Sequence, residues 1–290
     1  MTEGLQAEEG RPCGATPPEG GAGPRGADGG TIVLRLGYDG TAYSGFAEQP
    51  DGRIATVAGE LRRALETFLR REVDITCAGR TDAGVHAVAQ YVSLPVSAEE
   101  LEIGERRLMR AFAALLPHDI AVSAVLRADP GFSARFDARS RTYTYRIATG
   151  DAPPLLTRSV TWWHRGALDV GAMEDAAARI LGERDFKSFC KTSSAVGKPT
   201  CRNVMSADFR TERNLGEECL AFTIRGNAFL HSMVRTIVGT LVEIGSGRRD
   251  PAWMDEVLAA RDRAAAGPTA PACGLCFMGV EYDEGALRPL

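Results

Sequence analysis

The stretch Cys77–Tyr91, CAGRTDAGVHAVAQY, joins two segments that read as strands, DITCAGR and VAQYVSLPV. One carboxylate, Asp82, stands in it two residues after Arg80, surrounded by glycine and alanine. Glycine permits a tight turn and the close approach of a substrate to the backbone. If the segment is extended, the side chains of Arg80 and Asp82 leave the same face. The stretch therefore predicts a turn between strands that carries a paired acid and base.

A cation at that range keeps a carboxylate ionised, and the ionised form is the nucleophile. The same Arg-x-Asp pattern also occurs as an ordinary salt bridge in a loop. Taken alone, the stretch leaves a catalytic carboxylate and a structural ion pair as alternatives.

Outward from this turn, the hydrophobic pattern alternates between strand and helix. Helical spacing predicts helices near residues 56–71, from a Ser97/Glu100 capping box to Leu115, around Met173–Leu181, and near 229–244 and 251–262. Strand patterns include TIVLRLGYDG, DIAVSAVLRAD, RTYTYRIAT, TWWHR, CRNVMSADF, CLAFTIRGNAF and CFMGVEYD. We therefore predict an α+β fold of two similar mixed halves, with largely antiparallel sheet and a cleft between them.

Proline in DAPPLL, residues 151–156, predicts a boundary between an N-terminal half, 31–150, and a C-terminal half, 151–290. Residues 1–30 are rich in glycine and proline and nearly free of large apolar side chains. Such a segment cannot bury enough surface to offset the entropy of ordering, so we predict a disordered tail.

The composition is that of a globular protein, with 44% hydrophobic and 25% charged residues among 290. No apolar run reaches the roughly 20 residues that span a bilayer, and no secretory signal is recognisable at the N-terminus. We therefore expect a cytoplasmic protein without membrane contact.

The seven cysteines are scattered and odd in number, which is not the pattern of a disulfide framework. Cys273 and Cys276 form one CxxC, but no second ligand pair stands at a familiar spacing for zinc. We interpret them as two small semi-buried residues of a strand and predict no metal site.

Two further segments are candidates for function. RFDARSRTYTYR, Arg135–Arg146, is locally basic and aromatic although the net charge is −4. It could hold phosphate and stack bases, or it could be a solvated edge strand. The apolar helix in NAFLHSMVRTIVGTL carries Arg235, which is costly to bury without a partner such as Asp82.

These segments together resemble the TruA family of tRNA pseudouridine synthases. AGRTDAGVHA is similar to the family's catalytic signature, and YDGTAYSGF to its first strand and turn. DFKSFC, CRNV, NAFLHSMVRTIVGTL and GLCFMGVEY resemble later segments in the same order. The resemblance covers roughly residues 31–282 and implies isomerisation of uridine to pseudouridine at positions 38, 39 and 40 of the tRNA anticodon arm.

The resemblance also implies roles for individual residues. Asp82 matches the catalytic nucleophile, which attacks either C6 of the base or C1′ of the ribose. Tyr143 matches the tyrosine that packs on the target base and is a candidate for removing its C5 proton. Arg235 matches the arginine that pairs with the aspartate, and Arg80 one that helps to turn the nucleotide out. Leu275 matches a position that lines the pocket.

The implied partners are tRNA and a second copy of the chain, with the RNA lying across both subunits. From RFDARSRTYTYR we add Arg135 and Arg141 as substrate-binding residues. The reaction is neither a redox reaction nor a phosphate hydrolysis, so no cofactor is expected. Some positions depart from the family's usual residues, among them Phe46, Ala47, Ser232 and Thr236.

Two other classes of function compete with this interpretation. One is a tRNA-binding protein or chaperone that kept the fold and lost activity. The other is a metal or redox protein built on Cys273, Cys276 and His231. Asp82, Tyr143 and Arg235 are all present, which favours the enzyme.

Overall fold

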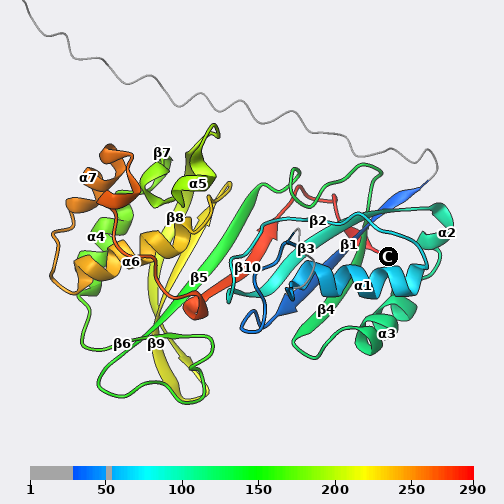
Figure 1. Cartoon of the computed structure of the whole chain (residues 1–290), viewed down its shortest axis with the longest axis horizontal. Coiled ribbons are helices and arrows are strands. Elements are labelled where there is room, and N and C mark those ends of the chain that lie inside the picture. Colours follow the sequence, from blue (N-terminus) through cyan, green and yellow to red (C-terminus); the bar gives the residue numbers. More distant parts are fainter. Residues whose placement is uncertain (1–28, 50–53) are drawn as a thin grey trace, which may run out of the picture.

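The computed structural model describes residues 29–49 and 54–290. The tail predicted for residues 1–30 lies, apart from its last two residues, outside the described residues. A single 11-stranded sheet runs through the described chain (Figure 1). Its strands are β1 (Gly30–Tyr38), β2 (Thr76–Cys77), β3 (His86–Val96), β4 (Ile120–Ala128), β5 (Ser140–Thr149), β6 (Trp162–His164), β7 (Gly182–Asp185), β8 (Cys201–Asn214), β9 (Glu217–Gly226), β10 (Leu275–Glu281) and β11 (Arg288–Pro289).

The strand order is β11-β4-β1-β3-β10-β5-β9-β8-β7, with β2 paired to β3 and β6 to β5. Only the β3–β10 and β5–β6 pairs are parallel among the described strands. The prediction of an α+β fold with largely antiparallel sheet is confirmed.

Strand β10 lies between β3 and β5, at the centre of the sheet, although it comes almost last in sequence. Strand β5 precedes the predicted boundary at residue 151 but pairs with β6, β9 and β10, which all follow it. The two predicted halves therefore share one sheet, and the residues of β3, β5 and β10 meet in its middle.

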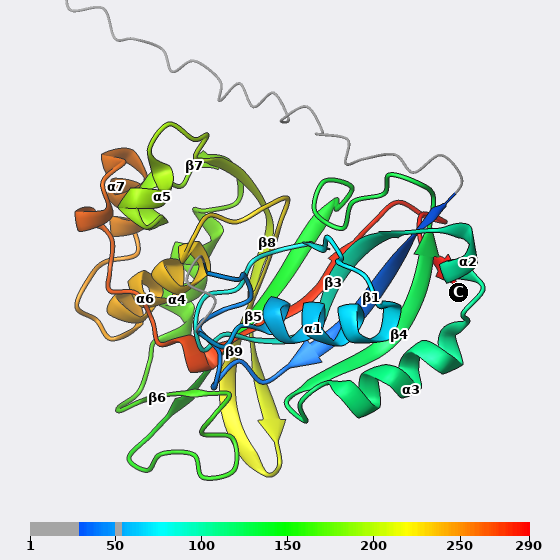
Figure 2. The ribbon, with the colours of Figure 1, turned by 45° about the vertical axis from the view of Figure 1, so that its right-hand side comes forward.

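The helices lie at the two ends of this sheet (Figure 2). They are α1 (Val57–Leu69), α2 (Ala98–Leu101), α3 (Glu105–Leu115), α4 (Val170–Ala178), α5 (Thr192–Ala195), α6 (Met233–Gly245) and α7 (Trp253–Ala260), with 3-10 turns η1 (Lys187–Phe189), η2 (Arg263–Ala265) and η3 (Ala272–Gly274). Helix α3 packs on β4, and α4 packs on α6 and β8. Among the helices of the described residues, none has both the length and the apolar character needed to cross a membrane.

The helix predicted from Ser97 to Leu115 is wrong in one respect, because the structure contains two helices there. The capping box of Ser97 and Glu100 is present and starts α2. Gly104 then has φ +79°, a left-handed conformation that ends the helical path before α3 begins. Leu115, the last residue of the predicted helix, is exposed at the end of α3.

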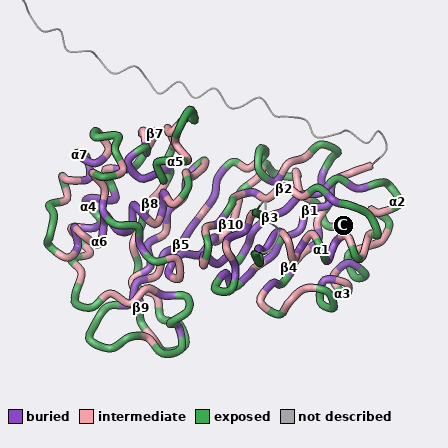
Figure 3. The backbone as a smooth tube through the Cα atoms, viewed as in Figure 1, coloured by how far each residue is buried: buried purple, intermediate pink, exposed green. Residues whose placement is uncertain are grey.

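The core follows the central strands, which are buried along most of their length (Figure 3). Tyr145 of β5, Phe222 of β9 and Phe277 of β10 are fully buried, and Ile237 and Leu241 of α6 join the same cluster. One continuous hydrophobic core thus includes both the central strands and α6.

Candidate active site

Asp82 lies in the connection between β2 and β3, and its loop is held by the YDGTAYSGF segment. The backbone oxygen of Thr81 accepts a hydrogen bond from the Phe46 amide at 3.1 Å. The Thr81 hydroxyl lies 2.8 Å from the Tyr38 hydroxyl. Gly84, with φ +74°, supplies a turn that other residues adopt at a cost. The small residues around Asp82 thus permit close packing of two backbone segments and leave the carboxylate at the surface of the loop.

Three residues at the start of α6 surround the Asp82 carboxylate. Ser232 Oγ donates to Asp82 Oδ2 at 2.8 Å, and Arg235 Nη1 donates to the same oxygen at 3.0 Å. His231 Nε2 lies 3.4 Å from the other oxygen, Oδ1. The Asp82 side chain is 19% exposed. Both short bonds fall on Oδ2, which leaves Oδ1 as the freer oxygen.

A segment near the C-terminus, around Ala270, holds Arg235 in place through hydrogen bonds. Its Nε donates to the backbone oxygen of Ala270 at 2.8 Å, and the Ala270 amide donates to the Arg235 oxygen at 3.0 Å. One helical turn later, a Cβ on Gly239 would lie 1.7 Å from the Pro268 oxygen, so α6 and this segment touch through backbone. The ion pair between Asp82 and Arg235, which the arginine within an apolar helix predicted, is confirmed.

Tyr143 of β5 lies beside this loop among aromatic rings. Its ring centroid is 5.2 Å from that of Phe229 and 4.8 Å from that of Phe277, both edge to face. A Cβ on Gly79 would lie 3.4 Å from the Tyr143 hydroxyl, so residue 79 packs directly beside that hydroxyl. Burial raises the pKa of the Tyr143 phenol well above its usual range. Leu275 opens β10 next to Tyr145 of β5 and is buried.

Arg80 and Arg135 are exposed, as a phosphate contact requires. The Arg135 guanidinium lies 5.4 Å from the ring centroid of Phe136, itself half exposed. The guanidinium of Arg80 has no ion-pair partner among the described residues. These two arginines are therefore free to meet a ligand.

Arg141 has a different environment from the other two arginines. It is 8% exposed, and all five of its N–H groups donate to backbone oxygens, which belong to Ala78, Arg135, Ala138 and Asn227. Burial lowers its pKa below the usual arginine value. In this structure the guanidinium braces three segments around the site, where the sequence predicted a contact with substrate.

Known proteins match this chain over most of its length. A protein-family model described as tRNA pseudouridine synthase matches residues 176–283. A tRNA pseudouridine synthase A of Methylobacterium nodulans is 42% identical over 254 residues, covering 88% of this chain and 96% of the relative. The protein of the same name from Francisella tularensis subsp. novicida is 38% identical over 257 residues, covering 88% and 95%. The chain belongs to the TruA family of tRNA pseudouridine synthases. TruA proteins are isomerases that convert uridine to pseudouridine.

His231 and Ser232 contact the Asp82 carboxylate, although the sequence analysis did not include them among the site residues. The sequence offers His231 as a metal or redox residue and, at i, i+4 spacing, on the same helix side as Arg235; in the structure its Nδ1 lies 3.0 Å from Ser194 Oγ and its Nε2 3.4 Å from Asp82 Oδ1. The sequence predicted a helix near 229–244, which places both residues inside it, whereas α6 begins at Met233 and leaves both just before its first turn. A polar residue directly before α6 lies at the same, N-terminal, end of that helix as Arg235.

The CxxC pair gives the TruA site no reactive thiol. Cys273 lies in η3 and Cys276 in β10, and both are free. Burial raises the pKa of Cys276 to about 11, and reactive thiols have lowered values. His231 contacts Asp82 and Ser194, and among the described residues no group of three or more His, Cys, Asp or Glu could hold a metal.

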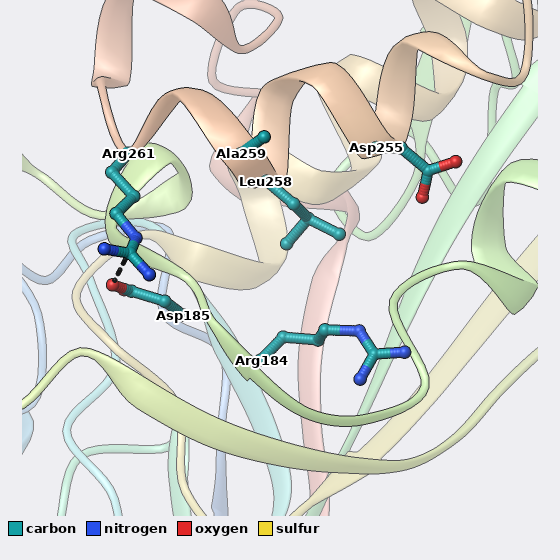
Figure 4. A pocket seen from close by; sticks show the side chains of 6 residues that line it. All are labelled: Arg184, Asp185, Asp255, Leu258, Ala259 and Arg261. Carbon is teal, nitrogen blue, oxygen red and sulfur yellow. Dashed lines mark ion pairs between the residues drawn. The ribbon is translucent and has the colours of Figure 1, made fainter. Parts of the chain in front are cut away.

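A separate hollow lies between β7 and α7, away from the TruA signature (Figure 4). It has a volume of about 460 Å³ and is lined by Arg184, Asp185, Asp255, Leu258, Ala259 and Arg261. Its carboxylates are already paired, Asp185 with Arg261 at 3.2 Å and Asp255 with Arg179 at 2.6 Å.

Proposed function

We propose that this TruA protein converts uridine to pseudouridine at positions 38, 39 and 40 of the tRNA anticodon arm, with Asp82 as the nucleophile. The observation that carries the proposal is the asymmetric environment of Asp82. Ser232 and Arg235 both bind Oδ2, at 2.8 and 3.0 Å, while Oδ1 has only His231 at 3.4 Å. An anion held by one oxygen, at the start of a helix whose dipole favours negative charge, presents the lone pairs of the other.

The reaction is an isomerisation in which atoms and electrons balance without a further reagent. The N1–C1′ bond breaks and leaves its electron pair on the base. After the base rotates, a C5–C1′ bond forms, C5 releases its proton and N1 takes one up. Asp82 bonds transiently through Oδ1, to C1′ of the ribose or to C6 of the base, and regains that electron pair when its bond breaks.

A target base inside an RNA helix must leave the stack before Asp82 can reach it, at a cost of a few kcal/mol. In our proposal Tyr143 receives the extruded base on its ring, and Leu275 lines the apolar wall beside it. Stacking on an aromatic side chain offsets about 1–3 kcal/mol of that cost. The edge-to-face packing of Tyr143 on Phe229 and Phe277 supports this role, because it fixes the ring in advance.

The arginines divide into two roles in this proposal. Arg80, next to the Asp82 loop, helps to turn the nucleotide out, and Arg135 binds phosphate near the site. Both are exposed. Arg141 positions the surrounding segments through the backbone oxygens of Ala78, Arg135, Ala138 and Asn227.

Tritium release from [5-³H]uridine in a tRNA transcript tests the function. We expect release by the wild type and none by Asp82→Asn or Asp82→Ala, each still binding the transcript. Glu281→Gln, at an exposed carboxylate paired with Arg225, is the control and keeps the wild-type rate. A wild type that binds the transcript without release would favour the alternative, an inactive tRNA-binding protein or chaperone, which family membership does not favour.

We further propose that the protein acts in the cytoplasm as a homodimer. The loop after β5 and the tip of the β8–β9 hairpin lie together (Figure 1) and expose Leu155, Leu156 and Leu215. An apolar patch rimmed by polar residues favours a protein contact. Sedimentation velocity should show a dimer that Leu156→Glu weakens. The matched control is Val196→Glu, at an exposed apolar side chain elsewhere, which should sediment as the wild type does. Sedimentation of the wild type and both variants as monomers would refute the dimer.

A further inference from the structure

Ser232 has a backbone conformation that its place in the fold does not explain. Four described residues other than glycine have positive φ: Arg70, Leu215, Ser232 and Arg261. Arg70 and Arg261 end helices α1 and α7, where the left-handed conformation is usual. Leu215 lies in the turn of the β8–β9 hairpin, which also uses positive φ. Ser232 begins a helix, and residues there normally have extended backbone.

The side chain of Ser232 also departs from the usual role at that position. Thr56 and Ser97 each accept a hydrogen bond from an amide in the first turn of the helix that they begin. Ser232 has φ +61° and ψ +8°, and its side chain makes no such bond to α6. Its hydroxyl donates to Asp82 Oδ2 instead, at 2.8 Å. Ser232 therefore combines a strained backbone with a side chain that leaves its own helix uncapped and binds Asp82.

The surrounding structure holds this conformation from both sides. The Lys191 amide donates to the oxygen of His231 at 3.2 Å, just before Ser232, and the Thr236 amide donates to the oxygen of Ser232 at 2.9 Å. Strained residues persist where neighbours determine their geometry, and they gather at functional sites. The geometry here brings a hydroxyl to the same oxygen that Arg235 binds, from a second direction.

We infer that Ser232 is a positioning residue for the isomerisation, a role that rests on the proposed function of Asp82. Arg235 alone would leave the carboxylate free to rotate about its single short bond. With Ser232 as a second donor to Oδ2, the carboxylate plane is fixed and Oδ1 points away from both donors. The Ser232 hydroxyl donates to Asp82, so in this inference the serine acts through the carboxylate and tRNA binding does not require it.

Two substitutions separate this role from a structural one. Ser232→Ala removes the hydroxyl and keeps the strain, while Ser232→Gly removes the hydroxyl and relieves it. We expect both full-length variants to release tritium about 10- to 100-fold more slowly in a single turnover, as misplacement of a reacting group does. The Kd for the tRNA transcript should stay within about threefold of wild type, and Ser232→Gly should melt at a higher temperature than Ser232→Ala.

A Ser232→Gly variant that is more stable than Ser232→Ala and yet as slow as Ser232→Ala is the result that a purely structural serine does not give. The control is Arg70→Gly, which relieves the same conformation at the end of α1 and should leave the rate unchanged. Ser232→Gly at the wild-type rate, or a loss caused by weaker tRNA binding, overturns the inference. If Asp82→Asn retains release, the proposed nucleophile fails as well; if it is inactive while Ser232→Gly is normal, only the role of Ser232 fails.

Discussion

At the scale of single residues, Tyr143 combines a ring fixed by its neighbours with a hydroxyl that has no hydrogen-bond partner among the described residues. Burial raises its pKa, so the phenol stays protonated at neutral pH and is a poor base. We expect Tyr143→Phe to keep the tritium-release rate within about tenfold, and Tyr143→Ala to lose at least about 100-fold because the stacking surface is gone. Equal losses in both variants would show that the hydroxyl takes part in proton removal.

The sequence predicted the partner of Asp82 better than it predicted the roles of the other arginines. A buried arginine requires a partner, so the interior position of Arg235 pointed to an acid, and the structure pairs it with Asp82. The sequence around Arg141 did not indicate which group its guanidinium would bind. A guanidinium can bind phosphate or backbone oxygens, and only the approach of Ala78 and Asn227, both distant in sequence, decides between them.

At the scale of elements, the β8–β9 hairpin holds the loop after β5 through Glu217. Its carboxylate accepts from the amides of Leu155, Leu156 and Thr157 and from the Thr157 hydroxyl. These bonds, led by the one from the Thr157 hydroxyl, lower its pKa to about 2. The stabilisation is therefore complete above the unfolded value near 4.5 and is lost as the pH falls towards 2.

We expect Glu217→Gln to speed hydrogen exchange of the three loop amides several-fold at pH 6, because the neutral amide is a weaker acceptor than the carboxylate. Peptide-level exchange measured by mass spectrometry at one pH gives the comparison. Glu218→Gln, at the neighbouring acid whose carboxylate lies 3.8 Å from Arg213, is the control and should leave these amides unchanged. Equal exchange in wild type and Glu217→Gln would mean that the loop does not depend on this carboxylate.

Element boundaries followed from local sequence where a cap marked them, and failed where a single glycine decided them. The capping box at Ser97 begins α2 as predicted, and α1, predicted near 56–71 from its apolar spacing, begins after the cap at Thr56. The break at Gly104 was not predicted, because a glycine inside an apolar helical pattern is compatible with either one helix or two. Strand β7 is short and half exposed, so it carries no alternation that would reveal it.

At the scale of the whole molecule, the order of strands could not be predicted from the sequence. Proline in DAPPLL suggested a boundary at residue 151, but strand pairing is set by contacts between distant residues. After the last helix the chain passes Arg235 and enters the sheet as β10, between β3 and β5. The site therefore draws on Asp82 and Tyr143 from one predicted half and on Arg235 from the other.

This arrangement predicts that the two halves unfold together, because both need β10. Phe277 is fully buried in β10 and packs on Tyr143, so Phe277→Ala should destabilise the protein by about 3–5 kcal/mol. Tryptophan fluorescence reports on the second half, which holds Trp162, Trp163 and Trp253, and hydrogen exchange in β1 and β3 reports on the first. In Phe277→Ala both probes should report unfolding at one common midpoint, shifted from that of the wild type. Val196→Ala, at a side chain that is 77% exposed, should shift the midpoint of neither probe. Separate midpoints would mean that each half keeps a core of its own and that β10 joins them only in the native state.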